Sequence, residues 1–194
     1  MGAGRMSPIP AFDGRGLLPP FEGSDETTPN RSPYDATMVE VAARFGVTAD
    51  RKALIGGLLD YRALLGHLGY TDRVQFVDGS FVEDVEAREG RPPRDIDVFS
   101  FLVRPALYQT DPGLWASKGF AEWAQEVVDR ARNKARFNLD TYAVAVDQHN
   151  GLQIIPTTIY WYSLFAHRRV THDWKGFLRV PLDAAADANA RSLI

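Results

Sequence analysis

The stretch "VDGSFVEDVEAREGRPPRDIDVFSF", residues 77–101, joins two segments with strand patterns and decides the expected fold. Gly79-Ser80 directly follows an alternating apolar segment, and Asp-Ile-Asp at 95–97 opens a second, more apolar one. Side chains two residues apart in a strand point to the same face. Asp95 and Asp97 are therefore predicted to present their carboxylates together. Because isolated charges on a buried face are costly, we expect these carboxylates to bind something.

The residue types in this stretch suit phosphate and metal chemistry. Gly79 permits a tight turn and close backbone approach, and Ser80 offers a hydroxyl and an N–H to a phosphate if a helix begins there. Carboxylate oxygens are the ligands that suit Mg²⁺ or Mn²⁺. Asp140, at the start of a third strand pattern, is the natural third carboxylate. A phosphate-binding turn beside a cluster of carboxylates is the arrangement that transfer of a nucleotidyl group needs.

The order of these features resembles the signature of the nucleotidyltransferase superfamily, which includes DNA polymerase beta and the minimal nucleotidyltransferases. The resemblance covers residues 73–147. It implies that Gly79 and Ser80 bind a nucleoside triphosphate. It also implies that Asp95, Asp97 and Asp140 are catalytic and bind Mg²⁺ or Mn²⁺. The insert between Ser80 and Asp95 is longer and more highly charged than the common spacing in that superfamily.

The whole chain also resembles an uncharacterised bacterial family of nucleotidyltransferase-like proteins, through the words "FDGRGLLPPF", "FVDGSFVED", "GRPPRDIDV", "KARFNLDTY" and "WYSLFAHRR". That likeness implies an α+β fold in which a nucleotidyltransferase-type mixed β-sheet is flanked by helices. Loosely alternating helix and strand patterns agree with such a sheet better than with a strict doubly wound one.

Composition limits the classes of function. The chain has 194 residues and a formal net charge of −3, which argues against a protein that coats nucleic acid by charge alone but leaves a local basic groove open. The lack of cysteine excludes disulfides, thiolate nucleophiles and cysteine-zinc sites. No apolar run reaches membrane-spanning length, and the N-terminal residues lack the apolar core of a signal peptide. We expect a cytoplasmic protein without membrane contact.

The chain divides into an irregular, proline-rich arm over 1–34, with 16–21 anchored on the body, and a single domain over 35–194. Periodicity and turn residues predict further elements. The Gly56-Gly57 pair weakens the second helix and predicts a close contact there. The expected helices are 35–45, Thr48–Leu68, 119–136, 156–169 and 183–194, and the expected strands are 73–79, 95–103, 139–147 and 177–180.

Two basic segments and one acidic segment leave alternatives open. Arg168, Arg169 and Lys175, in "HRRVTHDWKG", are candidate ligands for the triphosphate, or else part of a surface turn. Arg130, Arg132, Lys134 and Arg136 are interpreted as complementing the dipole at a helix C-terminus, and the alternative is a patch that binds triphosphate or nucleic acid. The acidic side chains of the 81–94 insert are interpreted as a solvated loop, and Asp78 as a polar residue at a strand end.

These observations support three hypotheses for function. The first is metal-dependent transfer of a nucleoside monophosphate from a nucleoside triphosphate to an unknown acceptor hydroxyl. The second is a catalytically silent nucleotidyltransferase-fold module that binds a protein partner, of the antitoxin or defence-component type. The third is a structural subunit, whose carboxylates form salt bridges with arginines such as Arg94 rather than bind metal.

Overall fold

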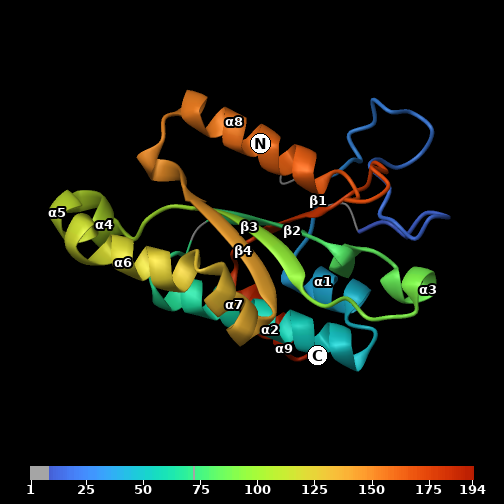
Figure 1. Ribbon diagram of the computed structural model, residues 1–194, viewed down its shortest axis with the longest axis horizontal. Coiled ribbons are helices and arrows are strands. Elements are labelled where there is room, and N and C mark those ends of the chain that lie inside the picture. The colour runs from blue at the N-terminus through green and yellow to red at the C-terminus, as the bar shows by residue number, and fades with distance from the viewer. Residues whose placement is uncertain (1–8, 72) are drawn as a thin grey trace.

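A mixed β-sheet lies at the centre of the molecule, with helices on both of its faces (Figure 1). The computed structural model describes residues 9–71 and 73–194, so the first eight residues of the predicted arm lie outside the described residues. The strands are β1 (Tyr34–Asp35), β2 (Arg73–Asp78), β3 (Ile96–Leu102), β4 (Leu139–Ala145) and β5 (Leu178–Pro181).

The strand order in the sheet is β1-β5-β2-β3-β4. Strand β3 runs parallel to β4, and β1 runs parallel to β5. Strand β2 is antiparallel to both of its neighbours, β3 and β5. The predicted α+β class with a mixed sheet flanked by helices is therefore confirmed.

The helices connect these strands and cover the sheet. Helix α8 lies on one face, and α2, α7 and α9 lie on the other (Figure 1). The α-helices are α1 (Met38–Phe45), α2 (Ala49–His67), α3 (Val85–Glu89), α4 (Ala106–Thr110), α5 (Pro112–Leu114), α6 (Phe120–Glu122), α7 (Arg130–Phe137), α8 (Gly151–Phe165) and α9 (Ala184–Arg191). The remaining helical turns are the 3₁₀ turns η1 (Ser80–Val82) and η4 (Val146–Gln148) and the π turns η2 (Trp115–Gly119) and η3 (Trp123–Val127).

Two of the predicted helices differ from those observed because of their N-caps. The helix expected over 119–136 is broken, since the side chain of Asp129 caps a new helix, α7, by accepting from the N–H of Arg132. The helix expected from Pro156 begins earlier, at a capping box formed by Asn150 and Gln153. Pro156 therefore lies inside α8 rather than in its first turn.

The period-2 pattern of the strands separates two apolar layers. Val77 and Val98 face the layer under α1, α2 and α9, whereas Phe76, Phe99 and Phe101 face the layer under α8. In the second layer, the ring of Trp161 from α8 stacks on Phe99 at a centroid distance of 4.4 Å. These aromatic contacts fix α8 over the middle of the sheet.

The arm is packed onto the body where 16–21 was expected to anchor. Leu17 and Leu18 are fully buried, and the N–H of Gly176 donates to the carbonyl of Leu18 at 2.7 Å. The close contact expected at the paired glycines of α2 is also present. A Cβ added to Gly57 would lie 2.1 Å from the carbonyl oxygen of Phe137, at the end of α7.

Candidate functional site

The Gly-Ser turn lies at the end of β2, and its backbone faces the first residues of β3. Gly79 has a φ of +87°, a conformation that favours glycine. A Cβ at this position would lie 2.8 Å from Oδ2 of Asp97, so the residue is also required by close approach. Ser80 begins the three-residue 3₁₀ turn η1 rather than a longer helix.

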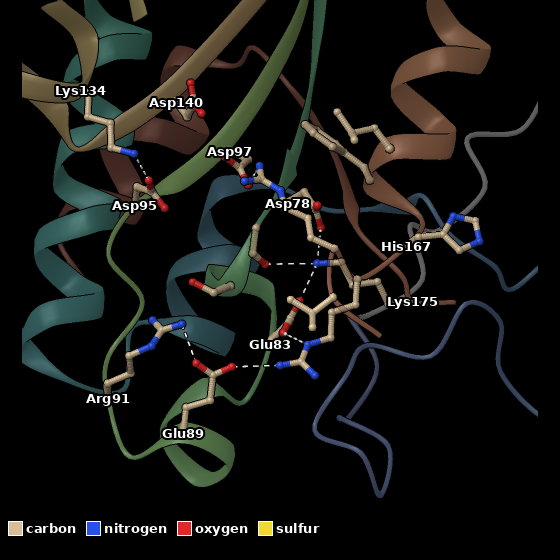
Figure 2. A pocket seen from close by; sticks show the side chains of 17 residues that line it. Asp78, Glu83, Glu89, Arg91, Asp95, Asp97, Lys134, Asp140, His167 and Lys175 are labelled. Carbon is tan, nitrogen blue, oxygen red and sulfur yellow. Dashed lines mark hydrogen bonds and ion pairs between the residues drawn. The ribbon is translucent and has the colours of Figure 1, made fainter. Parts of the chain in front are cut away.

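Strand register places three carboxylates in one row across the sheet. Asp78 of β2 pairs with Asp97 of β3, and Asp97 pairs with Asp140 of β4. Residues directly opposite each other in neighbouring strands project from the same face. The row therefore lies on the face covered by α8. Asp95 comes just before β3 and faces the same cavity (Figure 2).

Each of the three predicted metal ligands is paired with a cationic side chain. The guanidinium of Arg130 is bidentate on Asp140, with Nε and NH2 at 2.7 and 2.9 Å from its two oxygens. Lys134 contacts Asp95 (Figure 2). Arg169 reaches Oδ2 of Asp97 from the segment after α8, at 3.4 Å.

These pairs correct part of the interpretation of the basic segment at 130–136. Lys134 and Arg136 lie in the last turn of α7, as expected, but Arg130 is the first residue of that helix and does not lie at its C-terminus. Residues four apart lie on one side of a helix, and here that side faces the carboxylates. Arg132 and Arg136, on another side of the helix, instead pair with Glu126.

Lys175 lies at the floor of the site and is 2% exposed. Its Nζ lies 2.9 Å from Oδ1 of Asp78 and 2.8 Å from Oε1 of Glu83, and it donates to the carbonyl of Gly79 at 3.3 Å (Figure 2). The hydrogen bonds of the ammonium go to Glu83 and the carbonyl of Gly79. The contact with Asp78 is an ion pair, since Oδ1 of Asp78 has no hydrogen-bond partner in the described residues. Glu83 is 5% exposed, so its expected place in a solvated loop is wrong.

Burial shifts the pKa values of the charged side chains in this part of the site. Desolvation raises the pKa of Asp78 to about 7, although the charge of Lys175 opposes the shift. Burial alone would lower the pKa of Lys175, but the charges of Asp78 and Glu83 outweigh it and raise that pKa. Desolvation likewise raises the pKa of Asp97, with Arg169 opposing and the carboxylates of Asp95 and Asp140 adding to the shift.

The long insert and the segment after α8 form opposite walls of the site. Arg168 bonds Oε1 of Glu89 at 2.9 Å and lies 3.6 Å from Oε2 of Glu83. Arg91 also pairs with Glu89, at 2.6 Å (Figure 2). The insert contains helix α3, which ends at Gly90 in the left-handed conformation. It is therefore a structured wall held by ion pairs.

All eight residues predicted for the site line a single cavity of about 280 Å³. They are Gly79, Ser80, Asp95, Asp97, Asp140, Arg168, Arg169 and Lys175. Asp78, Glu83 and Lys134 also line it and were not predicted. The sequence signal for the basic side of the site is the spacing of Arg130 and Lys134, four residues apart and just before Asp140. Lys134 lines this cavity, whereas Arg130 lines an adjoining one with Lys134 and Asp140.

The donor chemistry of the site suits a hard divalent cation, since carboxylate oxygens from adjacent strands line one cavity. As the side chains stand, however, the described residues contain no cluster of three or more His, Cys, Asp or Glu ready to hold a metal ion. The ion pairs explain this arrangement, because Arg130 already occupies both oxygens of Asp140. A metal ion at this site would therefore compete with the cationic partners for the same carboxylate oxygens.

Comparisons with known proteins complete the description of the site. Over residues 9–71 and 73–194, none of the helices has both the length and the apolar character needed to cross a membrane. No curated protein and no solved structure matches the chain. A family model does match it, over residues 10–181, which include most of the arm, the insert and every residue of the cavity described above. The chain belongs to this family, DUF6932, a family of unknown function.

Proposed function

We propose that the chain is a metal-dependent nucleotidyltransferase of the nucleotidyltransferase fold. It would transfer a nucleoside monophosphate from a nucleoside triphosphate to an acceptor hydroxyl, with Mg²⁺ or Mn²⁺ as cofactor. The observation that carries the proposal is the convergence of one Gly-Ser turn and three carboxylates on one cavity. Gly79-Ser80 follows β2, and Asp95 precedes β3. Asp97 and Asp140 are the second residues of β3 and β4.

The roles of the residues follow from their positions. The backbone of the Gly79-Ser80 turn, which approaches Asp97 closely, would hold the phosphates beside the carboxylates. Arg168 and Arg169, on the wall after α8, would contact the triphosphate from the other side of the cavity. Lys175 is assigned a positioning role instead, because its ammonium faces Asp78, Glu83 and the carbonyl of Gly79.

The reaction forms one bond and breaks another. The acceptor oxygen attacks the α-phosphorus, the new P–O bond forms, and the anhydride bond to the β-phosphate breaks to release pyrophosphate. Asp140 accepts the proton of the acceptor hydroxyl, or holds that hydroxyl for attack. Asp95, Asp97 and Asp140 would hold the divalent cations, which neutralise charge on the phosphates and activate the attacking oxygen.

The experiment uses the full chain with each α-labelled nucleoside triphosphate and Mn²⁺, and measures release of pyrophosphate together with label on any acceptor in a cell extract. We expect release by the wild type and loss of at least a hundredfold in Asp97→Asn. Asp147→Asn is the matched control, since Asp147 is also paired with an arginine, Arg104 at 2.7 Å, but lies outside the cavity. Equal activity in all three proteins, or none in the wild type with every nucleotide, contradicts the proposal.

A second function, a silent module that binds a protein partner, is favoured by one observation. Helix α8 contains no charged residue, and Leu152, Ile155, Ile159 and Tyr160 are 79%, 48%, 59% and 61% exposed on it. Exposed apolar patches of this kind mark interaction surfaces. This function predicts that a complex isolated from cells survives Asp97→Ala and is lost in Ile159→Glu. A complex that survives Ile159→Glu counts against it.

A further inference from the structure

The three cations that pair with the site carboxylates share one property, which is exposure to solvent. The side chains of Arg130, Lys134 and Arg169 are 55%, 52% and 73% exposed. Their carboxylate partners are much less exposed, at 11% for Asp140, 22% for Asp95 and 12% for Asp97. Each pair therefore has a fixed carboxylate on the cavity side and a cation that can turn into solvent.

A cation of this kind is held weakly. Ion pairs with an exposed partner contribute little to stability, because water solvates the released side chain and salt screens the attraction. A divalent cation concentrates twice the charge on the same oxygens. It would compete with Arg130 at Asp140, because the guanidinium already bonds both oxygens of that carboxylate and repels a second positive charge. Binding of a metal ion at this carboxylate and retention of its ion pair therefore oppose each other.

The released cations would remain beside the carboxylates. Arg130 and Lys134 belong to a single helix, α7, so their backbone positions do not depend on the ion pairs. Lys134 and Arg169 line the cavity, whereas Arg130 lines an adjoining hollow together with Lys134 and Asp140. Guanidinium and ammonium groups gathered beside one another suit an anion with several phosphates.

We propose that Arg130, Lys134 and Arg169 are exchangeable partners that couple metal binding to nucleotide binding. In the metal-free protein they neutralise Asp140, Asp95 and Asp97. When a divalent cation binds these carboxylates, the displaced cationic groups bind the phosphates of the nucleotide. Metal and polyphosphate therefore bind cooperatively, and each is bound weakly alone. The inference rests on the proposed function, and adds to it a role for helix α7.

Titration with Mn²⁺, followed by the electron paramagnetic resonance signal of the free ion, tests the exchange without any need for turnover. Arg130→Gln removes the bidentate competitor, and Lys134→Gln is a second variant with an exposed side chain. The matched control is Arg132→Gln, since Arg132 lies on the same helix and pairs with Glu126 away from the cavity. We expect both test variants to bind Mn²⁺ at least tenfold more tightly than the wild type, and the control to be unchanged.

A second titration adds a saturating, non-hydrolysable nucleoside triphosphate analogue. We expect it to tighten Mn²⁺ binding at least tenfold in the wild type and less than threefold in Arg130→Gln. Equal or weaker Mn²⁺ binding by both test variants overturns the exchange while leaving the proposed function standing. Absence of Mn²⁺ binding in the wild type and in both variants overturns the exchange and the proposed function together.

Discussion

Replacement of the buried lysine gives the sharpest test of the physical account of the site. Lys175→Met keeps the length of the side chain and removes its charge. The variant leaves Asp78, which is 4% exposed, without its ammonium, and Glu83 with only its contacts to Arg88 and Arg168. Removing one partner of a buried ion pair costs about 3–5 kcal/mol, because the remaining charge stays desolvated.

The cost depends on pH in a defined direction. The pKa of Asp78 is about 7 with Lys175 present, and loss of the lysine charge raises it further. At pH 5.5 the carboxyl takes up a proton, so the buried charge disappears and the cost is reduced. At pH 8 the folded variant must either keep a charged carboxylate buried or take up a proton from a solution that has few, and both cost free energy. We therefore expect a loss of about 3 kcal/mol or more at pH 8 and a smaller loss at pH 5.5.

Urea denaturation of both proteins at the two pH values measures this difference. The control is Lys118→Met, the same substitution at a lysine that is 64% exposed and lies 3.7 Å from Glu122. It should change the free energy of unfolding by less than about 0.5 kcal/mol at either pH. A loss below about 1 kcal/mol for Lys175→Met at pH 8, or a loss that is larger at pH 5.5 than at pH 8, refutes the reasoning.

Three further changes test other features. Asp78→Asn removes a carboxyl whose pKa in the folded state is raised from 3.8 to about 7. The stability of the wild type relative to this variant should therefore fall from pH 4 to pH 7. A difference in free energy of unfolding that does not change with pH in urea titrations contradicts this. Gly79→Ala should lower the free energy of unfolding by about 1–3 kcal/mol in the same assay, because Gly79 has a φ of +87°. Unchanged stability of this variant contradicts the prediction. Gly57→Ala should lower the free energy of unfolding by about 2 kcal/mol, because a Cβ would meet the carbonyl of Phe137. Gly56→Ala should instead stabilise α2 by about 0.5–1 kcal/mol. Similar effects of the two substitutions rule out the close contact.

Local patterns in the sequence were sufficient to predict β2, β3, β4 and β5 and to group the site residues. They missed the two-residue strand β1, which lies where the arm was expected to end and a helix to begin. Alternation predicts β2 and β4, and period 2 explains why Asp95 and Asp97 face one cavity. Asp140 was predicted from its place at the start of a strand. Its direct pairing with Asp97 depends on the register between β3 and β4, which no local pattern encodes.

Other features were missed for identifiable reasons. The burial of Lys175 contradicts the usual exposure of lysine, and only the positions of Asp78 and Glu83 make it possible. These contacts join segments nearly a hundred residues apart, so they could not be read from local spacing. The start of α8, in contrast, could be predicted from the sequence, because Asn150 and Gln153 have capping-box spacing. Pro156 also suits a first helical turn, which is why it was taken as the start.

The position of β5 bears on the order in which the protein can fold during synthesis. This strand, Leu178–Pro181, follows the other four described strands in the sequence, yet it lies between β1 and β2 in the sheet. A growing chain that has not yet reached it leaves β2 with an open edge, which invites pairing with other chains.

The same delay affects the site. Lys175 lies just before this strand, so the carboxyls of Asp78 and Glu83 gain their buried counterion only after residue 175 has been made. Nascent chains that end before residue 175 should therefore stay incompletely folded around the Gly79-Ser80 turn. Completion of the sheet and completion of the cavity floor thus wait for the same short segment of the polypeptide, residues 175–181.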